Sequence, residues 1–202
     1  MRFPRRQRSF LLGRRAAKEA LSVCFPNRLP SEIEVVNGAF NQPFVRSAAP
    51  ISAEISLAHS HDAAVALVCP AGHPAGVDVE FVDPERSEVA GSCFTPSEAP
   101  VIQRLGLSTS AANFLLWSVK EALGKTLRCG LAVPFATLAV ESVTESDGVY
   151  ESLFINFPPF KARSWMLGDY VLSIVLPKKT SMAFKPSHEL ISLMSATEAL
   201  SC

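Results

Sequence analysis

The chain has 202 residues, of which 48% are hydrophobic, with 19 basic and 19 acidic side chains. This length suits one sizeable core or two small ones, and the balanced charge gives no overall attraction to nucleic acid or to a membrane surface. No run reaches the roughly 18 apolar residues that a membrane-spanning helix needs. We therefore expect a cytoplasmic globular protein with neither nucleic acid nor membrane as its partner.

The first eighteen residues are basic and contain no acid. Arg-rich, acid-poor openings are typical of organellar transit peptides, which is one interpretation of this segment. The other is a helix over residues 9–25, SFLLGRRAAKEALSVCF, with loosely periodic apolar positions. These positions are Phe10, Leu11, Ala17, Leu21 and Val23.

The five cysteines are widely spaced, and no two form a C-x-x-C pair. This spacing argues against a zinc site or a disulfide framework. We expect reduced, mostly buried thiols.

Further along the chain, apolar patterns predict a strand near residues 33–36 and a hairpin formed by residues 54–60 and 63–69. Thr95–Glu98 matches a helix capping box, and a longer helix is expected over residues 110–128. Four strand-like runs follow, at residues 135–143, 151–157, 161–167 and 170–176. The order of elements predicts two α+β halves, residues 1–85 and 86–177, and a loosely ordered tail, residues 178–202.

Residues 76–81 alternate, so Asp78 and Glu80 share one face of a strand, close enough to repel each other. In the long helix, Glu121 and Lys125 are neighbours one turn apart. The simpler interpretation is a solvated strand face and an exposed Glu–Lys pair. The alternative is that the three carboxylates converge, because Mg²⁺ takes oxygen ligands and is completed by substrate phosphates.

A helical wheel divides residues 112–130 into two sides. The apolar face consists of Ala112, Leu115, Leu116, Val119, Leu123 and Leu127. The side expected to lie away from the core carries Phe114, Trp117, Ser118, Glu121 and Lys125.

The ordered pair GVDVE (76–80) and WSVKEALGK (117–125) resembles the two signature motifs of the 4′-phosphopantetheinyl transferases. Three weaker matches surround it: LAHS (57–60), FTPSE (94–98) and FLLGRRAAKEAL (10–21). The last of these resembles a helix of the longer, Sfp/EntD-like members. The resemblance runs from about residue 8 to residue 176.

This resemblance implies a pseudo-dimer of two similar α+β halves, monomeric at this length, with the active site between the halves. It implies transfer of the phosphopantetheine arm of coenzyme A to a serine of an apo acyl or peptidyl carrier protein, releasing adenosine 3′,5′-bisphosphate. Asp78, Glu80 and Glu121 would ligate Mg²⁺, and Lys125 would offset phosphate charge. Glu121 would also be the candidate general base for the carrier serine.

By the same resemblance, His59 would donate a hydrogen bond to a phosphate of coenzyme A; otherwise it is a packed histidine on the inner strand face with Ile55 and Leu57. Arg8 and Arg14 would contact the 3′-phosphate, because a guanidinium suits bidentate phosphate contacts. Lys120 would reach substrate or solvent.

The chain departs from the family pattern in three places. Ala58 stands where members often have a serine, Gln42 stands where many have a lysine, and we expect the strand that relatives usually carry before the first helix to be missing. These departures favour a second hypothesis, a relative that binds coenzyme A or a carrier protein without transfer. A third hypothesis, an unrelated Mg²⁺-dependent phosphohydrolase, would not explain the order of the five motifs.

Overall fold

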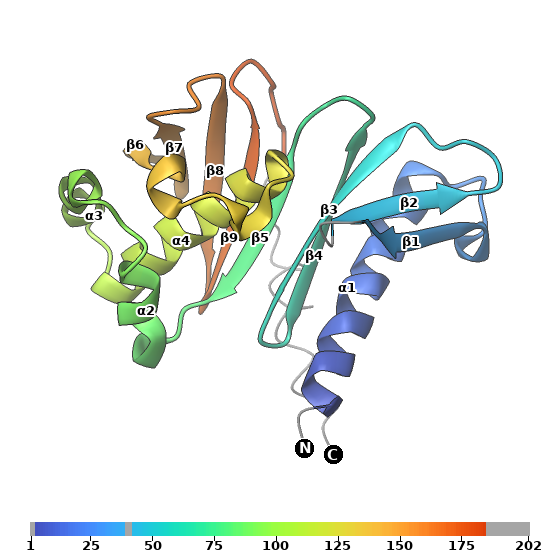
Figure 1. The fold of residues 1–202 in the computed structure, drawn as a ribbon, viewed down its shortest axis with the longest axis horizontal. Coiled ribbons are helices and arrows are strands. Elements are labelled where there is room, and N and C mark those ends of the chain that lie inside the picture. The colour runs from blue at the N-terminus through green and yellow to red at the C-terminus, as the bar shows by residue number, and fades with distance from the viewer. Residues whose placement is uncertain (1–2, 39–41, 185–202) are drawn as a thin grey trace.

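The computed structural model describes residues 3–38 and 42–184, which form two groups of elements lying side by side (Figure 1). The first group contains α1 (Phe3–Cys24), β1 (Ile33–Asn37), β2 (Pro43–Ser47), β3 (Ala53–Ser60) and β4 (Ala63–Pro70). The second contains β5 (Gly76–Phe81), α2 (Ser87–Gly91), α3 (Ala99–Arg104), α4 (Thr109–Thr126), β6 (Val140–Ser146), β7 (Val149–Phe154), β8 (Phe160–Leu167) and β9 (Tyr170–Pro177). Helices packed on antiparallel sheets confirm the α+β class.

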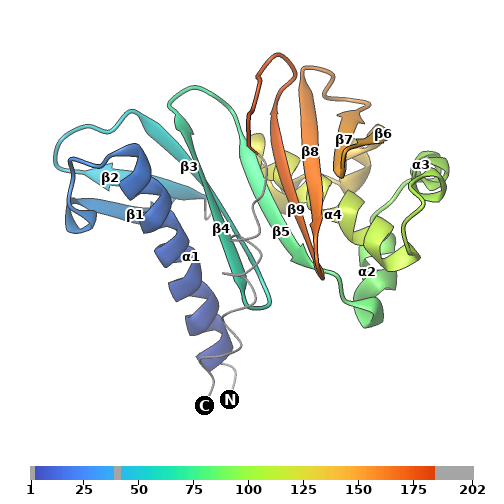
Figure 2. The same cartoon turned by 180° about the vertical axis from the view of Figure 1, so that it is seen from behind.

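In the first group, α1 packs against the antiparallel hairpin of β3 and β4 (Figure 2). Ala17 and Leu21 form a narrow buried apolar stripe on the helix and pack with Ile33, Val35 and Ile55. The predicted apolar positions Phe10, Leu11 and Val23 are exposed, because loosely periodic residues do not all fall on one stripe. The β3–β4 hairpin confirms the sequence prediction, whereas β2 was not predicted.

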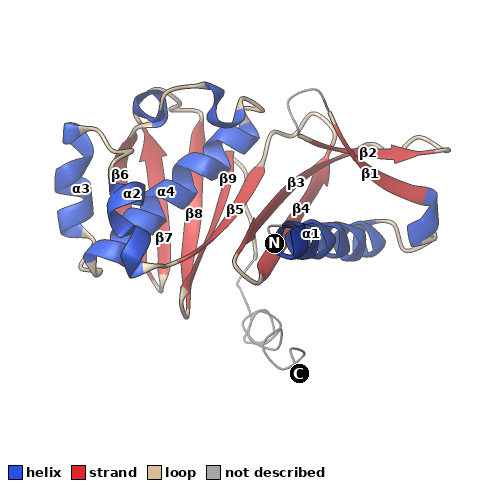
Figure 3. Cartoon of the chain, turned by 60° about the horizontal axis from the view of Figure 1, so that its bottom comes forward, coloured by secondary structure: helices blue, strands red, loops and turns tan. Residues whose placement is uncertain are grey.

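The second group is a five-stranded antiparallel sheet, in the order β5-β9-β8-β7-β6, with α4 lying across β5, β9 and β8 (Figure 3). By hydrogen bonding β5 belongs to this sheet, although the predicted division after residue 85 placed it in the first half. Phe114 and Ser118 are buried, contrary to the helical wheel, because α2 and α3 cover the other side of α4.

The two groups meet where β3 runs parallel to β5 without forming a ladder with it. Two serine side chains of β3 bridge the gap instead. The Val77 amide donates to Ser56 Oγ at 3.0 Å, and the Phe81 amide donates to Ser60 Oγ at 3.1 Å. We call this junction the β3–β5 seam.

Three other expectations need correction. Residues 135–138 form a 3₁₀ turn, so the strand there begins only at Val140. Residues 178–184 are not a loose tail, since Met182 and Phe184 pack on the core beside Trp165; the remainder of the predicted tail lies outside the described residues. The described thiols are free but not mostly buried: Cys24 is exposed, and the other three are partly buried. Cys202 lies outside the described residues.

Within the described part of the chain, no helix is both long and apolar enough to cross a bilayer.

Lys120 is also placed differently from the prediction, because its side chain is fully buried instead of reaching substrate or solvent. Its ammonium group donates to Glu98 Oε2 at 2.8 Å and to the carbonyls of Cys93 and Phe135 at 3.2 and 3.3 Å. Glu98 is equally buried and accepts further hydrogen bonds from Thr95 and Val140. The predicted capping box thus forms. Through its ion pair with Lys120, Glu98 connects α4 to the segments that contain Thr95 and Val140.

Replacing Lys120 with Met should cost about 3–5 kcal/mol of unfolding free energy, because it leaves the carboxylate of Glu98 buried without its cation. The measurement is denaturant unfolding monitored by circular dichroism. Lys161→Met is the matched control, since Lys161 and Glu151 form a more exposed ion pair at 3.1 Å that should contribute under about 1 kcal/mol. Equal losses in the two variants would contradict this role for the buried pair.

Candidate active site

Gly76 allows α4 to cross β5 at very close range. A Cβ atom at this position would lie 2.4 Å from the carbonyl oxygen of Ala122 and 2.7 Å from the amide nitrogen of Thr126. These are backbone atoms of α4, so they cannot turn aside as a side chain would. The crossing places the residues next to it, Asp78 on the strand and Lys125 on the helix, against each other.

Asp78 and Lys125 form an ion pair of 2.6 Å between Oδ1 and Nζ. Asp78 is only 3% exposed, so its carboxylate is held against the helix instead of facing water. Its second oxygen, Oδ2, is buried and has no hydrogen-bond partner. A buried carboxylate oxygen left without a donor is costly, which makes it a natural acceptor for a bound cation or donor.

Glu80 is held at both oxygens by neutral donors. Ser60 Oγ donates to Oε2 at 2.8 Å, and the indole Nε1 of Trp117 donates to Oε1 at 3.1 Å. Burial is the main cause that raises the pKa of Glu80, and the charge of Asp78 raises it further. The two hydrogen bonds and the charge of Lys125 act in the opposite direction.

Glu121 is half-buried on α4, one turn before Lys125. Burial, followed by the charge of Asp78, raises the pKa of Glu121 to about 7; Glu80 adds to this effect and Lys125 opposes it. The three carboxylates therefore lie within electrostatic reach of one another and of one lysine. Such an excess of negative charge favours a cation.

The described residues contain no three His, Cys, Asp or Glu side chains already grouped to hold a metal ion. The observed contacts give a reason, since Asp78 turns towards Lys125 while Glu80 is held by Ser60 and Trp117. The donor set is nevertheless all oxygen, which is the chemistry that Mg²⁺ prefers. Together with the partnerless Oδ2 of Asp78, it fits a hard divalent cation once Lys125 releases that carboxylate.

His59 lies on β3 with an exposed side chain. The alternative prediction of a packed histidine beside Ile55 and Leu57 is therefore wrong, because the apolar cover of that face ends before His59.

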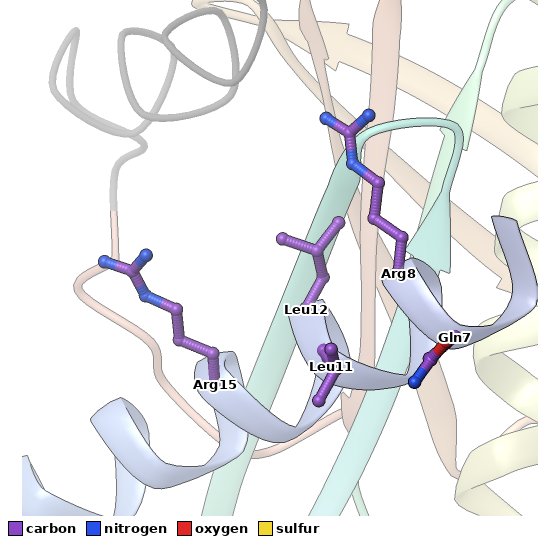
Figure 4. Close-up of a pocket in the computed structure, with 5 residues that line it drawn as sticks. All are labelled: Gln7, Arg8, Leu11, Leu12 and Arg15. Atoms are coloured by element: carbon purple, nitrogen blue, oxygen red, sulfur yellow. The ribbon is translucent and has the colours of Figure 1, made fainter. Parts of the chain in front are cut away.

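The two candidate arginines on α1 differ in how far they are engaged. Arg8 is half-exposed and pairs at 3.2 Å with Asp62, in the turn that follows His59 and Ser60. Arg14 donates to the carbonyl of Val35 and to Asn37, which ties α1 to β1. Arg8 and Arg15 also extend on the same side of α1, along a surface groove that includes Leu12 (Figure 4).

Sequence reasoning assigned no role to Ser60 or Trp117, although both stand inside the quoted motifs. For Trp117 the spacing gave a signal, since it precedes Glu121 by four residues and so lies on the same side of the helix. Only the structure shows that both residues hold Glu80.

A family model described as the 4′-phosphopantetheinyl transferase superfamily matches residues 74–175, just over half of the chain. The chain belongs to the 4′-phosphopantetheinyl transferase superfamily. No curated protein matches it.

The part that matches this transferase superfamily contains both acidic motifs, the buried Lys120–Glu98 pair, α4, the strands β5 to β8 and most of β9. Asp78, Glu80, Glu121 and Lys125 all lie within it. His59, Arg8 and Arg14 lie outside, so family membership supports phosphopantetheine transfer in general and leaves these three residues to be argued from their own surroundings.

Gly76→Ala should lower stability by about 1–3 kcal/mol and reduce transferase activity, because the new methyl group must push α4 away from β5. Thermal unfolding and transfer rate measure the two effects. Gly13→Ala in α1 is the matched control. A Cβ atom there would meet nothing within 4 Å, so this variant should gain up to about 1 kcal/mol of unfolding free energy. A Gly76→Ala protein as active and stable as wild type would refute the close approach.

Glu121→Gln should stabilise the metal-free protein at pH 8 and have no such effect near pH 4. Between the ordinary pKa of 4.5 and the raised value of about 7, the folded state holds the proton more tightly than the unfolded chain, so rising pH costs stability. Removing the ionisable group should recover about 1–2 kcal/mol, less than the full shift implies, because solvent screens a half-buried group. Urea unfolding across this pH range measures the gain, with Glu88→Gln, which changes an exposed carboxylate on α2, as the control. A gain that does not change with pH would contradict the raised pKa.

Proposed function

We propose that this protein transfers the 4′-phosphopantetheine group of coenzyme A to a serine of an apo acyl or peptidyl carrier protein, acting as a two-half, Sfp/EntD-like monomer. The observation that carries the proposal is the contact between the acidic strand and the acid–lysine turn of α4. There the Asp78–Lys125 pair lies within electrostatic reach of the charges of Glu80 and Glu121. The third hypothesis, a phosphohydrolase from another family, is excluded by the family match.

Asp78, Glu80 and Glu121 would hold Mg²⁺ at this cluster. When bound, the ion supplies positive charge that offsets the diphosphate of coenzyme A and the charge that builds up on the leaving group. The partnerless Oδ2 of Asp78 supports its part in this set.

Lys125 would exchange its carboxylate partner for a phosphate oxygen. The side chain is 27% exposed, and one contact to Asp78 leaves two of its three N–H donors for other partners. A lysine so placed can bind the substrate diphosphate and remain close to Asp78.

Glu121 would accept the proton of the carrier serine hydroxyl as its oxygen attacks phosphorus. Glu121 lies one turn before Lys125 on α4, within electrostatic reach of Asp78, and in the metal-free protein burial and that charge raise its pKa to about 7. A general base must lie within hydrogen-bond reach of the proton that it accepts, directly or through one water.

His59 and Arg8 would bind phosphates of coenzyme A from the first half. His59 is exposed, and Arg8 has one ion pair at a half-exposed site. Arg14 is a weaker candidate, because Val35 and Asn37 already take its guanidinium group.

Ala58 does not favour a relative without transferase activity. Its side chain is 4% exposed and packs with Val77 and Val79, so the missing hydroxyl leaves the protein surface unchanged. We keep active transfer as the function because all three acids and Lys125 of the motifs are present.

Incubation with Mg²⁺, coenzyme A and a panel of apo carrier proteins should add the mass of one phosphopantetheine arm to a carrier, detected by mass spectrometry. Asp78→Asn and Glu121→Gln should each slow transfer by at least about 100-fold, because each removes a charged ligand or base. Glu151→Gln, which changes a more exposed carboxylate on the sheet, is the control and should transfer like wild type. Full-rate transfer by both site variants would overturn the site. A wild-type protein that binds coenzyme A and modifies no carrier would favour the second hypothesis.

A further inference from the structure

Glu80 is the point where the two halves of the molecule meet in the candidate active site. Its own strand, β5, belongs to the second sheet, and its two carboxylate oxygens are held by one residue from β3 and one from α4. We propose that Ser60 and Trp117 are positioning residues that orient the Glu80 carboxylate for cation binding, an inference that rests on the proposed function.

The direction of the Ser60 hydrogen bond is fixed by its second contact. The Phe81 amide can only donate, so the Ser60 oxygen accepts from it at 3.1 Å. The single hydroxyl hydrogen is then free for Glu80 Oε2, 2.8 Å away. Ser60 therefore acts as a donor to this carboxylate, fixed in place by the backbone of the strand that carries Glu80.

Trp117 is a donor by its chemistry, because an indole N–H cannot accept a hydrogen bond. Its ring packs on Phe135, with ring centroids 5.1 Å apart, which restricts the indole to one orientation. Trp117 also lies one turn before Glu121 on α4. The helical turn that carries the candidate ligand Glu121 therefore also carries the residue that orients Glu80.

The two donors leave Glu80 able to bind a cation. Each carboxylate oxygen has about two lone-pair positions, and one on each oxygen is taken by the contacts described above. The remaining positions point in directions set by Ser60 and Trp117. A flexible glutamate side chain without these contacts would lose rotamer freedom on binding a metal, and affinity would fall.

Ser56 provides a matched comparison within the same strand. It lies four residues before Ser60 and accepts the Val77 amide at 3.0 Å, the same contact that Ser60 makes with Phe81. Within the part of the chain that the structure describes, its hydroxyl makes no hydrogen bond to Asp78, Glu80 or Glu121. Ser56→Ala and Ser60→Ala should therefore each remove one hydrogen bond of the β3–β5 seam. Ser56→Ala, however, leaves the hydroxyl that donates to Glu80 in place.

The experiment compares Ser60→Ala, Trp117→Phe and Ser56→Ala with wild type in the full-length protein. Mn²⁺ binding is measured by the loss of the free-ion paramagnetic resonance signal, with coenzyme A present and a coenzyme A blank subtracted. The Mg²⁺ dependence of transfer is measured in parallel. Ser60→Ala and Trp117→Phe should each weaken Mn²⁺ binding and raise the half-saturating Mg²⁺ concentration by about tenfold, with kcat at saturating Mg²⁺ much less affected. Ser60→Thr, which keeps the hydroxyl, should restore metal affinity.

Metal affinities of Ser60→Ala and Trp117→Phe equal to that of Ser56→Ala would overturn the inference while leaving the transferase function intact. If the wild-type protein modifies no carrier and both variants still bind Mn²⁺ more weakly than wild type, the positioning role is supported and the proposed function is rejected. A wild-type protein that binds no Mn²⁺ in the presence of coenzyme A overturns both.

Discussion

The close packing of α4 on β5 is the constraint on which the rest of the site depends. Gly76 has no side chain that would hold the helix away from the strand. The neighbouring strands also have small residues at this level of the sheet. Ser173 lies beside Asp78 in the strand register, and Ser164 lies beside Ser173, with their hydroxyls 2.8 Å apart. A helix on so thin a layer lies near enough to the sheet for short acidic side chains and a lysine to meet.

Two lysines of α4 differ in the number of acceptors that their ammonium groups contact. This difference separates a structural lysine from one that can bind a ligand. Lys120 is fully buried and donates to three fixed acceptors, so its charge is satisfied within the fold. Lys125 is partly exposed and pairs with one carboxylate in a cluster that holds three. The first lysine has no donor left for a ligand, whereas the second has donors to spare and excess negative charge nearby.

The sequence predicted those features that depend on local periodicity. Alternation in residues 76–81 and helical spacing in residues 110–128 both led to elements that the structure contains. The same patterns could not show what covers each face. Lys120 was expected to reach substrate or solvent, and the helical wheel placed Phe114 and Ser118 away from the core, because neither the motif nor the wheel shows that α2 and α3 pack on the second side of the helix. Asp78 is buried for the related reason that α4 covers the polar face of its strand. The membership of β5 depends on pairing with β9, almost a hundred residues away, for which short patterns hold no information.

The β3–β5 seam joins the halves through two serine hydroxyls instead of a backbone ladder. Separating the two groups there would break no strand pairing, but it would expose the apolar cluster in which Ala58 and Ala63 pack with Val77 and Val79 of β5. It would also move Ser60 away from Glu80 and remove one donor from that carboxylate. The apolar contacts across the seam therefore hold together the hydrogen bonds that define the candidate site.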